Sequence, residues 1–326
     1  MRDTAAIYEK IRHLIPEIEW VVHEPLISEI NRLKTEMGAV ILAHNYQLPE
    51  VFHGVADITG DSLALAKRAA EVDAGIIIMC GVHFMAETAK IVNPDKTVLL
   101  PDLEAGCSLA ESITAADVRE LKRRYPGVPV VTYVNTSAEV KAETDVCCTS
   151  ANAIEVVESL GADRVIFLPD EYLGRWVRAN TDVEVILWDG RCEVHEKFTA
   201  EEIQAYRDQF PGVRVIAHPE CSPEVLEAAD MVGSTAGMIK YLGEERPAKV
   251  VMITECSMSD NVSVEYPEID FVRSCTICPH MKKITLGSIL ESLKKRQFEI
   301  VVEPGIASRA LRAVDRMIEV GRGERG

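Results

Sequence analysis

The sequence repeats one pattern three times, and this recurrence limits the possible folds more than any other feature. Residues 43–51 read AHNYQLPEV, residues 132–140 read TYVNTSAEV and residues 217–225 read AHPECSPEV, each next to a run rich in Val and Ile. Downstream and in register, the segments ADITGDSLALAKRA, TDVCCTSANAIEVV and ADMVGSTAGMIKYL each place small residues before a helical pattern. A further apolar run follows each of them. We infer three copies of one strand-helix-strand-helix-strand unit.

The apolar runs indicate parallel sheets. GAVILAH, AGIIIMC and VPVVTYV are nearly continuous in apolar and β-branched residues, which is typical of strands covered on both faces. Any α/β chain alternates strands and helices, but it need not repeat H-x-x-x-x-P-E-V in two copies, as this one does. We expect an α/β fold of three homologous αβα parallel-sheet domains with pseudo-threefold symmetry about a common centre. The expected domains are 1–112, 113–196 and 197–289, with C-terminal helices of 290–326 packed on the first.

The composition favours small-molecule partners. The 326 residues include 35 basic and 52 acidic side chains, and the net charge of -17 repels nucleic acid and anionic membranes. The start, MRDTAAIYEKIRHLIPEIEW, lacks the apolar core of a signal peptide, and no later run is long enough to span a bilayer. We expect a cytoplasmic protein with no nucleic-acid or membrane partner. Its nine cysteines should then be free thiols or metal ligands rather than disulfides.

Each copy of the unit is followed by a cysteine. LPDLEAGCSLA, LWDGRCEVHEK and RSCTICPHMKK contain Cys107, Cys192 and Cys278, which are 85 and 86 residues apart. A pseudo-threefold axis would bring the three thiols together, and three thiolates are suited to an iron-sulfur cluster. A [4Fe-4S] cluster held by three cysteines keeps one iron open to act on a substrate as a Lewis acid.

The segment SCTICPHM leaves the role of a second cysteine open. Cys275 and Cys278 form a C-x-x-C pair, and Cys278 is the preferred ligand because it keeps the spacing of the other two. Alternatively, both are ligands, or the pair is a thiol-disulfide switch that withdraws a ligand. The remaining cysteines lie on apolar strands or beside the helix-opening turns and are expected to be small buried side chains: Cys80, Cys147, Cys148, Cys221 and Cys256. Cys221 is the exception to watch, because it follows the polar residues His218 and Glu220.

Polar residues recur at equivalent points of the three copies. Pairs of them stand at the ends of the first strands, where open α/β sheets bind ligands: His44 and Tyr46, Tyr133 and Asn135, His218 and Glu220. Hydroxyl residues stand at the predicted helix starts: Ser62, Ser150 and Thr235. Each hydroxyl alone could be a simple helix cap. As a set, they predict a pocket for an acidic, phosphorylated substrate, because helix N-termini favour anions.

With these motifs in place, nearly the whole chain resembles the quinolinate synthase family, the iron-sulfur enzymes of NAD biosynthesis. The resemblance rests on AHNYQ, GDS, EAGCSLA, YVN, TSANA, GRCEVHEKF, AHPEC, GSTAGM and CPHMKKITL. It implies three αβα layers around one [4Fe-4S] cluster. It also implies a reaction in which iminoaspartate condenses with dihydroxyacetone phosphate, losing phosphate and two waters to give quinolinate. An aspartate oxidase or dehydrogenase would be the functional partner that supplies iminoaspartate.

The resemblance also implies site residues. The cluster ligands fall on Cys107, Cys192 and Cys278. The substrate contacts fall on His44, Tyr46, Ser62, Tyr133, Asn135, Ser150, His218, Glu220, Ser234 and Thr235. Among these, the expected catalytic groups are Glu220 as a base, aided by His218, Tyr133 as a proton relay, and Tyr46.

Other functions are compatible with a three-cysteine pattern. A hydro-lyase of the aconitase type also uses an open iron, but it has no need of a triose phosphate. An iron-sulfur electron carrier or redox sensor needs a fully ligated cluster and has no use for the His, Glu and Tyr residues at the strand ends. A zinc protein is the remaining alternative.

Overall fold

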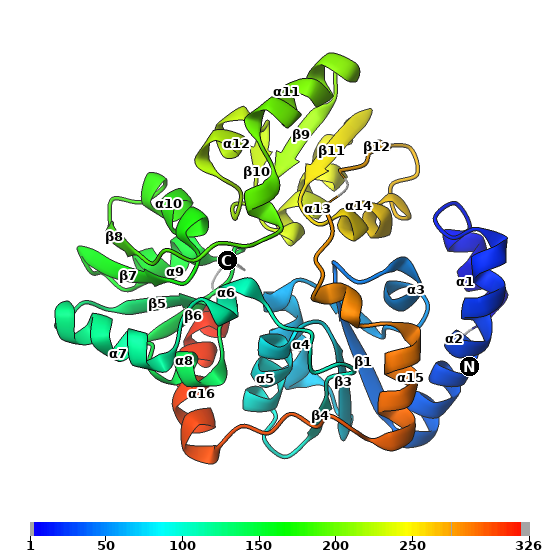
Figure 1. Cartoon of the computed structure of the whole chain (residues 1–326), viewed down its shortest axis with the longest axis horizontal. Coiled ribbons are helices and arrows are strands. Elements are labelled where there is room, and N and C mark those ends of the chain that lie inside the picture. The colour runs from blue at the N-terminus through cyan, green and yellow to red at the C-terminus, as the bar shows by residue number, and fades with distance from the viewer. Residues whose placement is uncertain (1–2, 275, 321–326) are drawn as a thin grey trace. The chain divides into compact units, whose positions relative to one another are not determined.

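The computed structural model describes residues 3–274 and 276–320 (Figure 1). Cys275, and with it the C-x-x-C switch, lies outside the described residues. The chain forms two compact units, one of Met1–Gly106 and Glu255–Val301, the other of Cys107–Thr254 and Val302–Gly326. Within the described ranges, no helix combines the length and the apolar character needed to cross a bilayer.

The first unit contains a parallel sheet with strand order β2-β1-β3-β4. Its strands are β1 (Ala39–His44), β2 (Ile58–Gly60), β3 (Ile76–Cys80) and β4 (Thr97–Leu99). Its longer helices are α1 (Thr4–Ile11), α2 (Glu17–Met37), α4 (Ser62–Glu71), α5 (His83–Val92), α14 (Cys256–Ser263) and α15 (Leu286–Lys295). Short elements complete the unit: α3 (Pro49–Phe52), β12 (Asp270–Val272) and η2 (Met281–Lys283). Gly38 ends α2 with a left-handed φ of 59° and leads directly into β1.

The second unit contains a sheet with the equivalent order β6-β5-β7-β8. Its strands are β5 (Val130–Tyr133), β6 (Val146–Cys148), β7 (Arg164–Leu168) and β8 (Glu184–Leu187). The helices between residues 107 and 198 of this unit are α6 (Ser108–Glu111), α7 (Ala115–Arg124), α8 (Ala138–Ala142), α9 (Ala153–Ser159), α10 (Glu171–Ala179) and η1 (His195–Lys197). The same unit holds β9 (Arg214–Ala217), β10 (Met231–Val232) and β11 (Lys249–Ile253), with α11 (Ala200–Gln209), α12 (Pro223–Ala228) and α13 (Thr235–Glu245).

The three sheets share one topology, which confirms the predicted α/β class and the repeat. In the third sheet, β9 likewise lies between β10 and β11, so the first strand of each sheet lies between its second and third strands. The register also repeats: His44 pairs with Gly60, Tyr133 with Cys148, and Ala217 with Val232. This order makes the carboxyl end of each first strand a topological switch point, where α/β sheets bind ligands. The domain boundaries and the pseudo-threefold arrangement remain predictions.

The last helix corrects one expectation. α15 packs on α2, as expected for the first domain, but α16 (Pro304–Val320) packs on α8, α9 and β6. The reason is its apolar stripe at helical spacing, which is buried in the second unit: Ala310, Ala313, Val314, Met317 and Ile318. The Asn152 side-chain amide also donates to the Met317 carbonyl at 3.3 Å. The prediction that residues 290–326 all pack on the first domain is therefore wrong for α16.

Candidate active site

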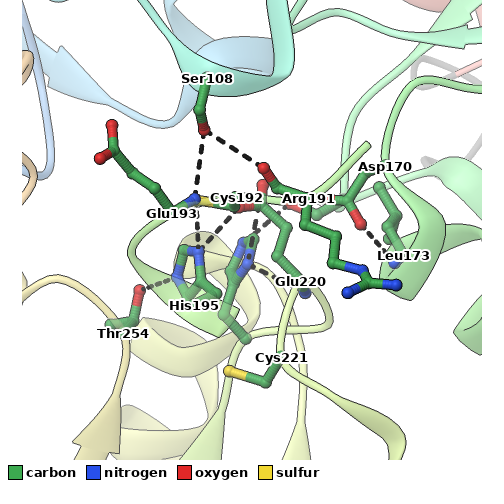
Figure 2. Close-up of polar contacts among 12 residues, drawn as sticks. Ser108, Asp170, Leu173, Arg191, Cys192, Glu193, His195, Glu220, Cys221 and Thr254 are labelled. Carbon is green, nitrogen blue, oxygen red and sulfur yellow. Dashed lines mark hydrogen bonds and ion pairs between the residues drawn. The ribbon is translucent and has the colours of Figure 1, made fainter. Parts of the chain in front are cut away.

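A buried carboxylate, Glu220, is the centre of a polar cluster in the second unit (Figure 2). Glu220 is 3% exposed and follows the carboxyl end of β9. The Tyr133 hydroxyl, at the end of β5, donates to Glu220 Oε1 at 2.5 Å. His195 Nδ1 lies 2.8 Å from Glu220 Oε2, and His218 Nδ1 lies 3.9 Å from Oε1. Three side chains from separate parts of the sequence therefore surround the same carboxylate.

The turn after β9 sets the position and the tautomer of His218. The His218 N–H bonds to the Ile253 carbonyl of β11, and the Cys221 N–H bonds back to the His218 carbonyl. The Glu220 N–H donates to His218 Nδ1 at 3.4 Å, so in the neutral ring the proton belongs on Nε2. Nε2 lies 3.2 Å from the Ser150 hydroxyl and can donate to it.

His195 is a site residue that the sequence analysis missed. Its Nδ1 lies 3.2 Å from Cys192 Sγ as well as near Glu220, and its Nε2 lies 2.9 Å from the Thr254 hydroxyl (Figure 2). The ring stacks on His218 with centroids 4.7 Å apart. The signal was present in GRCEVHEKF, because a Cys and a His three residues apart on a helical turn lie on the same face.

Two buried carboxyl groups of this cluster differ in protonation. Burial acts to raise the pKa of Glu220, but His195, His218 and Tyr133 outweigh it and hold that pKa well below its usual value. Asp170 is fully buried, and burial together with the Glu220 charge raises its pKa well above the usual value. Asp170 Oδ1 accepts from the Leu173 N–H at 2.8 Å and caps α10. Glu220 is thus ionised at neutral pH, and Asp170 favours its neutral form.

A serine hydroxyl connects the segments that carry Cys107 and Cys192. Ser108, which follows Cys107, donates to the Arg191 carbonyl and accepts from the Glu193 N–H, both at 3.2 Å (Figure 2). These two residues flank Cys192. Burial is the main cause that raises the pKa of the Cys192 thiol, and the charges of Glu220 and Cys107 add to it. The contribution of Cys107 agrees with a short distance between the Cys107 and Cys192 thiols.

The three predicted cysteine ligands begin the same local motif. In each, the cysteine carbonyl accepts from the N–H four residues later, on Glu111, Glu196 and Lys282. In each, a threonine seven residues after the cysteine forms a capping box that starts the next helix: Thr114, Thr199 and Thr285. The sequence analysis missed these threonines. They support Cys278 as the equivalent of Cys107 and Cys192, since Cys275 lies ten residues before Thr285.

In the first unit, a buried ion pair connects Cys278 with the AHNYQ segment. Lys282 Nζ lies 2.9 Å from Glu255 Oε1 and donates to the Tyr46 carbonyl at 2.7 Å. The Cys278 N–H donates to the same Glu255 oxygen at 3.4 Å. Burial raises the pKa of Glu255, although Lys282 opposes the shift, and burial raises the pKa of Cys278 to about 11. Neither Glu255 nor Lys282 was predicted from the sequence.

His44 and Tyr46 lie at the end of β1 in the same unit. Their rings meet edge to face with centroids 4.6 Å apart, and the Tyr46 N–H donates to His44 Nδ1 at 3.2 Å. Asn261 Nδ2 supports this segment by donating to the Asn45 and Gln47 carbonyls at 3.0 and 2.7 Å. The sequence placed His44 and Tyr46 at a strand end, and the structure agrees.

The helix-start hydroxyls are not helix caps. The N-cap positions of α4, α9 and α13 are Asp61, Asn152 and Ser234. Ser62 and Thr235 are instead the first helical residues, and Ser150 precedes its cap and contacts His218. Asn135, a predicted substrate contact, has a buried Oδ1 for which the described residues provide no hydrogen-bond partner. Four other cysteines are buried as expected, namely Cys80, Cys147, Cys148 and Cys221, whereas Cys256 is partly exposed.

Parallel sheets with a buried carboxylate, histidines, a tyrosine and thiols beyond their strand ends form the type of site that enzymes use for small molecules. Residues 28–319 match the family described as Quinolinate synthetase A protein. A quinolinate synthase of Mesorhizobium japonicum, named Quinolinate synthase 1, is 62% identical over 97% of this chain and 98% of its own length. The quinolinate synthases of Agrobacterium fabrum and Caulobacter vibrioides are 59% and 58% identical, each over 97% of this chain and over 92% and 88% of their own lengths. The chain therefore belongs to this family of enzymes.

Proposed function

We propose that this enzyme makes quinolinate for NAD biosynthesis by condensing iminoaspartate with dihydroxyacetone phosphate, with loss of phosphate and two waters. The observation that carries the proposal is the buried cluster of Tyr133, Glu220, His195 and His218 next to Cys192, in a chain whose relatives are named quinolinate synthases. The acid-base groups and the thiol are on separate strands and loops, so their convergence is a property of the fold rather than of one motif.

The cysteines fit a [4Fe-4S] cluster held by Cys107, Cys192 and Cys278. Soft thiolates suit such a centre, and the three residues begin the same local motif. The effect of Cys107 on the pKa of Cys192 supports two ligands on one centre. When bound through three cysteines, the cluster supplies an open iron that acts as a Lewis acid. Cys275 is not needed in this scheme.

Glu220 is the proposed base for carbon-bound protons. A carboxylate with a lowered pKa is ionised but only weakly basic, so it needs activation. Its low pKa depends in part on the hydrogen bond from Tyr133. If the Tyr133 hydroxyl turns towards the substrate, Glu220 loses a donor and becomes more basic, and Tyr133 can then deliver a proton during cyclisation. His218, which contacts the Ser150 hydroxyl, lowers the pKa of Glu220 and so favours its charged form.

The remaining polar residues are proposed to hold the carboxylates and the phosphate. Asn135 supports this assignment because its buried Oδ1 has no partner among the described residues, as expected for a group that bonds a ligand. Ser150 lies beside His218, within the same cluster. The other proposed contacts are His44, Tyr46, Ser62, Ser234 and Thr235.

We also propose a cytoplasmic location, where thiols remain reduced. Because an imine hydrolyses in water, an aspartate oxidase or dehydrogenase is the proposed source of iminoaspartate.

The test is an assay of anaerobically purified enzyme with iminoaspartate and dihydroxyacetone phosphate, measuring quinolinate and phosphate. Glu220→Gln should lower turnover at least about 100-fold, the usual contribution of a general base, while iron and sulfide contents stay unchanged. Glu224→Gln, an exposed glutamate four residues further on, is the matched control and should behave as wild type. Dehydration of a hydroxy acid without phosphate release would favour the hydro-lyase instead.

A further inference from the structure

We propose that Cys192, His195 and Glu220 bind a single divalent transition-metal ion, such as Zn²⁺, when the protein has no cluster, and that this ion competes with cluster assembly for Cys192. The three residues offer one sulfur, one nitrogen and one oxygen donor, all within 4.8 Å of one another. His195 and Glu220 are 1% and 3% exposed. The proposal concerns the cluster-free protein and goes beyond its proposed reaction.

The distances suit a tetrahedral ion. Zn²⁺ bonds of about 2.0–2.3 Å to N, O and S ligands require neighbouring donors about 3.3–3.6 Å apart. Cys192 Sγ lies 3.2 Å from His195 Nδ1, and that nitrogen lies 2.8 Å from Glu220 Oε2. The third pair, Cys192 Sγ and the Glu220 oxygen, lies within 4.8 Å. Side-chain adjustments of about an ångström would therefore admit the ion. It would replace the proton that His195 and Glu220 share.

The surroundings of His195 already orient it as a ligand. A metal-bound histidine usually donates its second ring N–H to a fixed acceptor. Thr254 occupies that place, 2.9 Å from Nε2, so Nδ1 faces Cys192 and Glu220 (Figure 2). Stacking on His218 fixes the plane of the ring.

The donor set and its charge favour Zn²⁺, Co²⁺ or Fe²⁺ over Mg²⁺ or Ca²⁺. The hard cations prefer all-oxygen sites, whereas a thiolate with an imidazole suits the borderline transition metals. One thiolate and one carboxylate neutralise a divalent ion, which lowers the cost of its burial. Water or the Tyr133 hydroxyl, which is 2.5 Å from Glu220 Oε1, can complete the coordination. Since Cys192 is also a proposed cluster ligand, one occupant excludes the other.

The test is a Co²⁺ titration of the full-length, cluster-free protein under reducing, anaerobic conditions. We expect one Co²⁺ per chain, with the visible bands of a tetrahedral site and the sulfur-to-cobalt absorption of one thiolate, displaced by Zn²⁺. His195→Gln and Glu220→Gln should weaken binding at least 10-fold. Cys107→Ser and Cys278→Ser are matched controls and should bind Co²⁺ as wild type does.

Absorption from two or three thiolates, or loss of binding in Cys107→Ser, would overturn the proposal, because the ion would then occupy the cluster cysteines. The thiolate count of the wild type decides this even if a variant fails to fold. Zn²⁺-loaded protein should also take up less iron and sulfide on reconstitution than protein treated with chelator; equal uptake would refute the competition. Neither measurement uses substrate, so failure here is separate from failure to form quinolinate.

Discussion

Removing Lys282 should destabilise the first unit strongly, because it leaves a buried carboxylate without its cation. Glu255 is fully buried, and its Oε1 lies 2.9 Å from Lys282 Nζ. Lys282 also donates to the Tyr46 carbonyl and the Ser257 hydroxyl, both at 2.7 Å. Breaking a buried pair from one side typically costs about 3–5 kcal/mol. For a unit of this size, that loss lowers the melting temperature by about 10 °C.

The change is Lys282→Met, which keeps an unbranched side chain, one atom shorter, and removes the charge. The assay is chemical and thermal unfolding followed by circular dichroism. The adjacent Lys283 is the matched control. It lies 2.8 Å from Glu104, but both side chains are exposed, so Lys283→Met should cost no more than about 1 kcal/mol.

The double variant tests whether the buried pair itself is the cause. Adding Glu255→Gln to Lys282→Met removes the uncompensated charge, so the double variant should be more stable than the sum of the two single changes predicts. If Lys282→Met costs less than 1 kcal/mol, or the two changes simply add, then the ion pair does not stabilise the segment that carries Cys278.

Three further predictions follow from the same geometry. Cys107→Ala, Cys192→Ala and Cys278→Ala should each abolish the brown cluster colour on anaerobic reconstitution. If a variant keeps its full iron content, the cysteine that was replaced is not a cluster ligand. Asp170 has a raised pKa in the folded state, so its contribution to stability is fully present below the ordinary pKa of 3.8 and is lost as the pH rises through the raised pKa. Asp170→Asn should flatten this decline in unfolding measurements made at increasing pH, and an unchanged pH profile would contradict it. Met317→Ala on α16 should cost about 2–5 kcal/mol of unfolding free energy, because the side chain is fully buried, and a cost below 1 kcal/mol would mean that α16 packs loosely.

The repeat made much of the fold predictable. Continuous apolar runs are the signature of strands covered on both faces, and β1, β5 and β9 follow it, with most of their side chains buried. The polar residues that end these strands were predicted as site residues because α/β sheets generally bind ligands at the carboxyl ends of their strands. The capping threonines after each cysteine were visible in the sequence too, although their meaning depends on the register of the repeat.

Other residues were beyond the reach of sequence patterns. His195 and Thr254 meet 59 residues apart in the chain, and Tyr133 and Glu220 are 87 residues apart. Nothing local to Glu255 indicates that it is buried against Lys282. Whether Ser62 and Thr235 cap their helices could not be decided from the sequence either, and in the structure the neighbouring Asp61 and Ser234 occupy the caps.

The order of the residues was sufficient to predict three parallel sheets, a cysteine after each repeat and polar groups at the strand ends, because periodicity and local spacing carry that information. The ionisation of Glu220, the orientation of His195 and the packing of α16 on the second sheet depended on the folded chain. Burial and long-range contacts set pKa values and rotamers, and both arise only when distant segments pack together.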